Sequence, residues 1–145
     1  MLQPKKTKFL KPHVLKYKGK ATSCNKIEFG EYALISRDNW YIKANQLESL
    51  RLLLSKKLEK KGIFQFRIFP HMARTKKAEG VRCGSGKGMV EFYYAPVCDG
   101  TVILEIKGKD GNLSDKEAVE LLRQCNYKLP VRTSILKKNN IYVEV

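Results

Sequence analysis

Strand-forming residues cluster in two stretches of the central part of the chain. Residues 27–36 are rich in Ile, Phe, Tyr and Leu, and residues 63–69 place apolar side chains on both faces before Pro70. The first stretch predicts a strand pair or a bent strand that ends at a turn over residues 37–39. The second predicts a buried central strand, because apolar residues on both faces are typical of strands covered on both sides.

Leucines at helical spacing lie between these two stretches. Over residues 43–61, leucine recurs at every third or fourth position, which predicts a helix that is ended by Gly62. Asn45 and Glu48 have the spacing of a capping box at its start. A second helix is predicted over residues 114–126, where Ser and Glu three residues apart form another capping box.

The remaining apolar stretches predict further strands. Residues 90–97 and 101–107 flank an Asp-Gly step, which favours the positive backbone angles of a tight turn, so we expect a β-hairpin. Two short strand-like pieces follow at 131–136 and 141–145. Two helices packed on a mostly antiparallel sheet make an α+β fold, with residues 27–136 as its single domain.

The first 26 residues form a basic arm, in which lysines recur and no acid occurs before Glu28. A segment so self-repelling and so poor in apolar groups cannot bury itself, so it needs a polyanion, which we interpret as RNA. Phe9 and Tyr17 are candidates for stacking on unpaired bases. Residues 137–145 are expected to form a C-terminal extension. The predicted RNA-binding residues of the arm are Lys5, Lys6, Lys8, Phe9, Lys11, His13, Lys16, Lys18 and Lys20.

A second basic segment spans residues 71–88. It shows neither helical nor strand periodicity, contains a single acid, Glu79, and closes with alternating glycines. We therefore predict a long basic Gly-rich loop, and long irregular loops within compact domains are usually functional or disordered. Its predicted RNA-contacting cations are Arg74, Lys76, Lys77, Arg82 and Lys87.

The overall charge supports a polyanionic partner. The 145 residues suffice for one ordinary domain and contain 29 Lys and Arg against 14 Asp and Glu, a formal net charge of +15. This surplus is best explained if phosphates neutralise it and release their counterions. A basic surface kept only for solubility is the alternative.

The other compositional signals exclude several classes of protein. No apolar stretch reaches the length of a spanning helix, and no signal peptide is recognisable, so we expect a soluble protein with no membrane partner. The four cysteines are dispersed without a Cys-x-x-Cys pair, which favours reduced thiols over a metal site or disulfides.

The glycine-rich segment Gly84–Gly88 also raises the possibility of a nucleotide-dependent enzyme. A Walker loop, however, requires a glycine where Val81 stands and Ser or Thr where Gly88 stands. His71 has no acid or nucleophile beside it in the sequence, so a catalytic or metal-binding role for it is disfavoured. A free-standing RNA chaperone is a further alternative.

Several segments together resemble the L-sixteen family of bacterial-type large-subunit ribosomal proteins, and they occur in the family's order over nearly the whole chain. The most specific are the opening nine residues and the glycine loop. The matching segments are Met1-Leu2-Gln3-Pro4-Lys5-Lys6-Thr7-Lys8-Phe9, Gly19-Lys20-Ala21, Phe29-Gly30, Gln46-Leu47-Glu48, Arg67-Ile68-Phe69-Pro70-His71-Met72, Thr75-Lys76-Lys77, Val81-Arg82, Gly84-Ser85-Gly86-Lys87-Gly88 and Lys128-Leu129-Pro130.

This resemblance implies an α+β protein lodged among large-subunit RNA helices near the peptidyl-transferase centre, with neighbouring ribosomal proteins as partners. It implies no catalysis and no cofactor. The arm lysines would contact ribosomal RNA, and the loop would lie towards the aminoacyl-site tRNA. Carried over by position, the arm contacts are Lys5, Lys6, Lys8, Lys18 and Lys20, and the loop residues are Lys76, Lys77, Arg82 and Lys87.

The sequence also departs from the usual bacterial pattern of that family. Leu10 stands in place of arginine, Lys43 in place of the threonine that starts the first helix, and Cys83 in place of methionine. These changes, with the lysine-, isoleucine- and asparagine-rich composition, lead us to expect an organelle-encoded, mitochondrial member. Plastid and bacterial cytoplasmic origins remain open.

Overall fold

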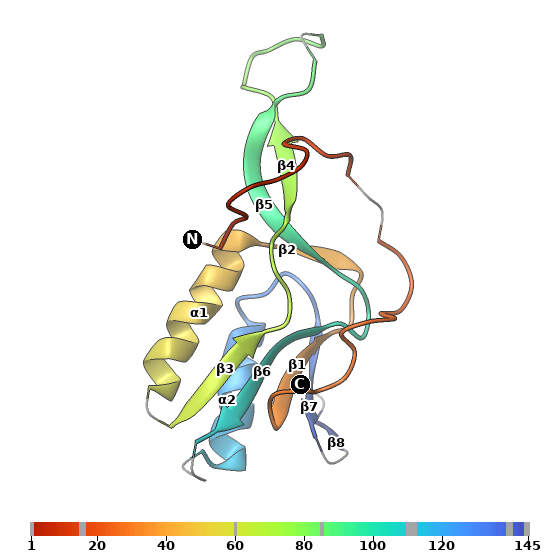
Figure 1. Cartoon of the computed structure of the whole chain (residues 1–145). Coiled ribbons are helices and arrows are strands. Elements are labelled where there is room, and N and C mark those ends of the chain that lie inside the picture. The colour runs from red at the N-terminus through yellow and green to blue at the C-terminus, as the bar shows by residue number, and fades with distance from the viewer. Residues whose placement is uncertain are drawn as a thin grey trace.

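The computed structural model describes residues 2–14, 17–59, 61–84, 86–109 and 113–138, and the backbone of 141–143. These residues form two helices and eight strands, and every pair of neighbouring strands is antiparallel. The predicted α+β class is confirmed, although the strands divide between two sheets. In Figure 1 the helices lie beside the larger sheet, and the β4–β5 loop projects from the opposite end of the molecule to α2.

The larger sheet has five strands in the order β3-β6-β1-β7-β8. The expectation of a buried central strand at 63–69 is wrong, because β3 lies at the edge and ends at Phe66. Phe64 and Phe66 pack against the core, whereas Ile63 is 53% exposed on the outward face. The strand bounds are β3 Gly62–Phe66, β6 Val102–Gly108, β1 Tyr32–Ser36, β7 Thr133–Lys137 and β8 Ile141–Val143.

The smaller sheet has three strands in the order β2-β5-β4, namely β2 Trp40–Lys43, β5 Met89–Val97 and β4 Met72–Lys76. The predicted hairpin of β5 with β6 is therefore wrong. The tight turn itself forms, with φ of 89° at Gly100 and the Thr101 N–H donating to the Cys98 carbonyl at 3.0 Å. The Asp-Gly step specifies the turn. The strands that flank it, β5 and β6, pair with other strands and therefore belong to different sheets.

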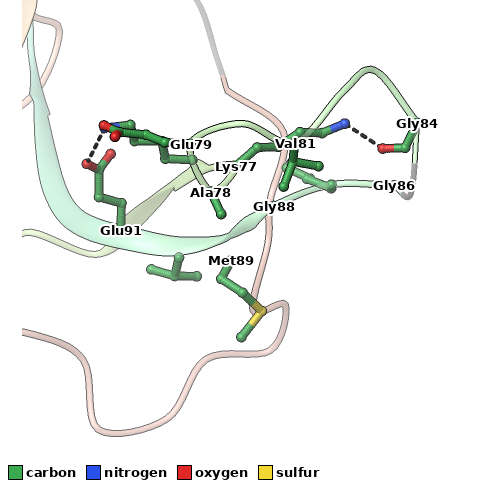
Figure 2. Close-up of a pocket in the computed structure, with 12 residues that line it drawn as sticks. Lys77, Ala78, Glu79, Val81, Gly84, Gly86, Gly88, Met89 and Glu91 are labelled. Atoms are coloured by element: carbon green, nitrogen blue, oxygen red, sulfur yellow. Dashed lines mark hydrogen bonds and ion pairs between the residues drawn. The ribbon is translucent and has the colours of Figure 1, made fainter.

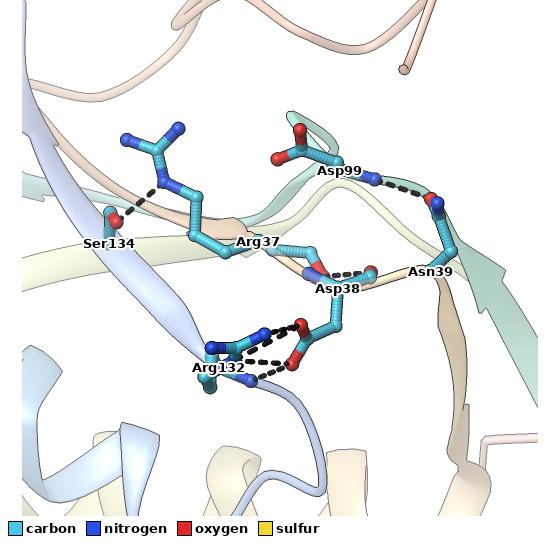
Figure 3. Close-up of polar contacts among 7 residues, drawn as sticks. Arg37, Asp38, Asn39, Asp99, Arg132 and Ser134 are labelled. Carbon is cyan, nitrogen blue, oxygen red and sulfur yellow. Dashed lines mark hydrogen bonds and ion pairs between the residues drawn. The ribbon is translucent and has the colours of Figure 1, made fainter. Parts of the chain in front are cut away.

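The turn between β1 and β2 holds the two sheets together (Figure 3). Asp38 accepts the backbone N–H of Arg132 at 2.8 Å and its guanidinium Nη2 at 2.9 Å. Asn39 Oδ1 accepts the Asp99 N–H at 2.9 Å. The predicted turn at 37–39 is confirmed, and its side chains fix the segment that leads into Trp40.

The two helices are α1 (Ala44–Leu58) and α2 (Asp115–Asn126). The predicted cap of α2 is confirmed, since Ser114 Oγ accepts the Glu117 N–H at 3.3 Å and Glu117 Oε2 accepts the Ser114 N–H at 3.2 Å. The predicted cap of α1 is wrong. Its N-cap is Lys43, whose N–H donates to Gln46 Oε1 at 2.9 Å. The helix ends four residues before Gly62, which instead opens β3.

The main apolar core lies between the helices and one face of the larger sheet. Leu47, Leu50 and Leu54 of α1 are fully buried in it, together with Leu104 and Ile106 of β6. The opposite face of β1 carries a smaller cluster around Ala33, Ile35 and Val102, against which Cys24 and Ile27 pack. The end of the arm thus belongs to the folded body.

A buried carboxylate explains why β1 starts only at Tyr32. Glu105 is fully buried, and its Oε2 accepts the N–H groups of Phe29 and Gly30, each at 2.7 Å. The guanidinium of Arg67 lies 3.5 Å from the other carboxylate oxygen. Because these backbone donors bond a side chain, residues 27–31 do not form the first part of a strand.

Candidate nucleic-acid interface

The loop within the basic segment 71–88 is shorter than the sequence predicts, because part of the segment forms a strand. Its first part forms β4, which pairs with β5 so that Ala73 lies opposite Tyr93 and is buried. Arg74 therefore lies on a strand, with its guanidinium carbon 5.6 Å from the centroid of the Tyr41 ring. The described irregular part, residues 77–84 and 86–88, lies at the end of the β4–β5 ribbon (Figure 1).

Close backbone contacts shape the base of this loop. A Cβ added at Gly88 would stand 2.6 Å from the carbonyl carbon of Lys76 and 2.8 Å from the backbone nitrogen of Lys77. Lys77 Nζ donates to the Gly84 carbonyl at 2.6 Å, across the loop (Figure 2). Lys76 lies 3.8 Å from Glu91. Two of the predicted loop cations thus have contacts within the protein.

The arm crosses the base of the loop. Lys11 Nζ donates to the Lys87 carbonyl at 3.2 Å, and Lys87 Nζ donates to the carbonyls of Lys11 and Pro12 at 3.1 and 2.6 Å. Farther along the arm, Tyr17 and Lys18 lie beside the smaller sheet, and the Ala21 N–H donates to the Asp99 carbonyl at 2.8 Å. Lys11 and Lys87 are 76 residues apart in the sequence, so the structure joins the two predicted basic segments into one surface.

Most of the predicted arm and loop cations lie exposed on this surface. Among the described residues, the side chains of Lys5, Lys6 and Arg82 have no hydrogen-bond or ion-pair partner. Lys8 lies over the ring of Phe9, which is 67% exposed, at 5.5 Å from its centroid. Lys16 lies outside the described residues. The exposed members of the predicted set are Lys5, Lys6, Lys8, Phe9, His13, Lys18, Lys20, Lys76, Lys77, Arg82 and Lys87, while Lys11 and Arg74 are half-buried.

Several acids of the folded body, in contrast, are paired with its own cations. A hydrogen bond from Arg67 lowers the pKa of Glu28, one from Arg132 lowers that of Asp38, and one from Lys61 lowers that of Glu117. The arm contains eight lysines and no acid, which is more than half of the net charge. The unbalanced charge therefore lies on the arm and the loop.

The glycine loop does not have the geometry of a phosphate-binding loop. A hollow beside it is lined by Lys76, Lys77 and Lys87 but also by Glu79 and Glu91 (Figure 2). The strand β5 follows the glycines, whereas dinucleotide- and nucleotide-binding loops use the N–H groups of a following helix. The described part of the loop gives no support to the nucleotide-dependent alternative.

Sequence analysis missed an aromatic cluster on the smaller sheet. Trp40 and Tyr41 stack with ring centroids 5.1 Å apart, and Tyr41 also contacts Phe92 and Tyr94. Lys43 Nζ lies 4.5 Å from the Phe92 centroid. The strand alternation of Phe92 and Tyr94 is typical of core residues, and Tyr94 is indeed buried, whereas Phe92 is only half-buried. The signal that could have found the cluster is the Trp-Tyr pair directly after a turn, where one of two adjacent strand residues must face outwards.

Other site chemistries find little support in the structure. Across the described segments, no group of three His, Cys, Asp or Glu side chains is placed to hold a metal ion. None of the helices there is both long and apolar enough to cross a membrane. All four cysteines are free, with Cys83 exposed and Cys125 buried, and burial raises the pKa of the Cys125 thiol to about 12.

Comparison with known proteins gives concordant matches along the chain. The family model described as Ribosomal protein L16p/L10e matches residues 4–136. Proteins named large ribosomal subunit protein uL16 are similar to this chain. The one from Ureaplasma parvum is 47% identical over 138 residues, which is 95% of this chain and 97% of the relative. Those from Mycoplasma pneumoniae and Spiroplasma kunkelii are 44% and 46% identical, covering 97% and 95% of this chain and 99% and 98% of the relatives.

These relatives are bacterial, so the expected mitochondrial origin receives no support from them. They are named as ribosomal proteins and not as enzymes. Since the family model covers most of the chain and each relative matches nearly its full length, the chain belongs to the ribosomal protein L16p/L10e family.

Proposed function

We propose that this protein is a structural constituent of the large ribosomal subunit that binds large-subunit ribosomal RNA through its arm. The observation that carries the proposal is the arrangement of charge on the arm. Its described lysines are exposed apart from the half-buried Lys11, the arm contains no acid, and the reciprocal Lys11–Lys87 contacts fix the arm against the β4–β5 ribbon. Such cations position a protein on phosphates without reading sequence.

The loop is proposed to face the aminoacyl-site tRNA and so to help shape that site near the peptidyl-transferase centre. Family membership supports this orientation, as does the projection of the loop from the end of the molecule farthest from α2 (Figure 1). Within the loop, Arg82 is the best candidate for an intermolecular contact. Lys77 and Lys87 already bond backbone carbonyls of this chain, whereas the exposed guanidinium of Arg82 bonds no described group.

For the compartment, the bacterial organism names of the relatives favour a bacterial ribosome over a mitochondrial one. Neighbouring large-subunit proteins are proposed as further partners on the strength of family membership. A free-standing RNA chaperone would share the basic arm but would not stay on the subunit. Cosedimentation with large subunits after a high-salt wash separates these two functions.

The tRNA-side proposal is tested with Arg82→Ala in reconstituted large subunits. We expect the affinity of the aminoacyl site for tRNA to fall by about tenfold, because one charge-assisted contact of roughly 1.5 kcal/mol is lost. Incorporation of the protein into subunits should stay normal. Filter binding of labelled tRNA and sucrose-gradient profiles measure the two quantities separately.

The matched control is Arg123→Ala, which removes the same charge from the exposed surface of α2. It should leave both tRNA occupancy and incorporation unchanged. An Arg82→Ala protein that impairs only assembly, or that binds tRNA as the wild type does, contradicts the proposed orientation of the loop.

A further inference from the structure

A small hollow lies where the arm crosses the smaller sheet. Its volume is about 280 Å³, close to the lower end of the range of roughly 300–1,000 Å³ for small-ligand clefts. Its lining includes Tyr17 and Lys18 from the arm, Trp40 and Tyr41 from β2, Arg74 from β4 and Tyr94 from β5. A space of this size suits one planar ring system better than a larger ligand.

The aromatic wall of the hollow is held in place by its own packing. Trp40 is 53% exposed, yet its ring stacks on Tyr41 with an interplanar angle of 18°. Tyr41 in turn contacts Tyr94 at a centroid distance of 5.1 Å and carries the guanidinium of Arg74 over its ring at 5.6 Å. An exposed indole fixed in this way offers a flat surface on which a planar group can stack.

Tyr94, one of the residues that line the hollow, has a buried hydroxyl without a partner among the described residues. Tyr94 is only 1% exposed, and within the described part of the chain its hydroxyl has no hydrogen-bond partner. Tyr17 lines the same hollow, and burial, followed by the proximity of Tyr94, raises the pKa of its phenol. A buried polar group without a partner is costly, so a ligand that supplied one would gain affinity.

The charged groups of the hollow define which ligands suit it. Lys18 and Arg74 are cationic, and no carboxylate occurs among the described residues that line it. An aromatic face, an unpaired hydroxyl and two cations match a planar base that carries a phosphate. Single-stranded RNA presents such bases when they are unstacked from a helix.

We propose that this hollow holds one unstacked nucleobase of a single-stranded RNA segment. The base stacks on Trp40, its edge bonds the Tyr94 hydroxyl, and Lys18 faces the adjoining phosphate. The inference rests on the proposed binding of RNA by the arm. The arm lysines contact phosphate alone, whereas the hollow adds a contact that requires a base.

Two strands of equal charge test the proposal with the full-length protein. One is a short oligoadenylate, and the other is a ribose-phosphate strand of the same length without bases. Fluorescence anisotropy of labelled strands gives both affinities. We expect the base-bearing strand to bind about 5- to 150-fold more tightly, which corresponds to stacking of one base. Trp40 is the sole tryptophan, so quenching of its fluorescence by unlabelled oligoadenylate reports stacking directly.

Two variants assign the preference to the hollow. Trp40→Leu should abolish it, and Tyr94→Phe should reduce it while leaving the thermal unfolding midpoint unchanged or higher, because the unpaired hydroxyl is removed. The matched control is Tyr127→Leu, an 84% exposed aromatic that does not line the hollow, and it should bind as the wild type does. A preference that survives both hollow variants overturns the assignment.

Three other results also overturn the proposal, and they are distinguishable. If both strands bind equally tightly, the arm binds phosphate as proposed but the hollow holds no base. If neither strand binds, RNA binding by the arm is itself wrong. If adenosine monophosphate binds as tightly as the oligoadenylate, the hollow binds a free nucleotide and not a base of an RNA strand.

Discussion

At the scale of single residues, the fold depends on the hydrogen bonds that the buried carboxylate of Glu105 accepts. Glu105 lies between apolar residues in the middle of β6 and accepts backbone N–H groups from a segment more than 70 residues earlier. Gly30 makes this approach possible, since a Cβ there would stand 2.6 Å from the Ile106 carbonyl oxygen. Without these donors, a charge buried in the sheet would be strongly destabilising.

We therefore predict that Glu105→Gln lowers the free energy of unfolding by about 3–5 kcal/mol, as expected when a buried charged pair is broken. The amide keeps the volume, but its NH2 group cannot accept the Glu28 N–H that Oε1 accepts, and it has no negative charge to balance Arg67. Urea denaturation followed by circular dichroism measures the change. The control Glu28→Gln alters the exposed partner of the same arginine and should have little effect. An unfolding midpoint of Glu105→Gln equal to that of the wild type would refute this account.

At the scale of elements, the helix starts are decided by bonds within a few residues. The α2 cap joins Ser114 and Glu117, so Ser114→Ala should cost about 1 kcal/mol of stability. Denaturant midpoints measure this loss. Ser55→Ala, an exposed position within α1, is the control and should be neutral or slightly stabilising. A Ser114→Ala protein as stable as the control contradicts the capping role.

The same locality explains what the sequence could predict. The α2 cap, the turn at 37–39 and the buried leucines of α1 follow from residues close together in the chain, and all are confirmed. Strand partners do not follow in this way, because β5 and β6 are neighbours in sequence but pair in different sheets. The contact of Lys11 with Lys87 has no local signal either, so sequence analysis identified two basic segments without predicting that they meet.

At the scale of the whole molecule, ion pairs between acids and cations lie in the folded body, whereas, among the described residues, the arm and the loop tip carry cations without such partners. Ion pairs such as Asp38–Arg132 and Asp115–Lys137 balance charges within the body. The arm and the loop tip are left with lysines and Arg82 that no described acid offsets. Self-repulsion of these cations is relieved when phosphates take up positions beside them.

We propose that the arm and the loop bind the phosphates of ribosomal RNA. If about six to eight are neutralised, the logarithm of the affinity should fall linearly with the logarithm of the salt concentration, with a slope of about −5 to −7. Replacing Lys5, Lys6 and Lys8 by alanine should make the slope shallower by about 2 to 3, whereas replacing Lys56 and Lys57 at the end of α1 should not change it.

The decisive measurement is filter binding of the purified protein to naked large-subunit ribosomal RNA over a series of salt concentrations. A steep slope that becomes shallower only in the arm variant is the predicted result. A slope near zero, or one that the arm lysines do not affect, would contradict the account.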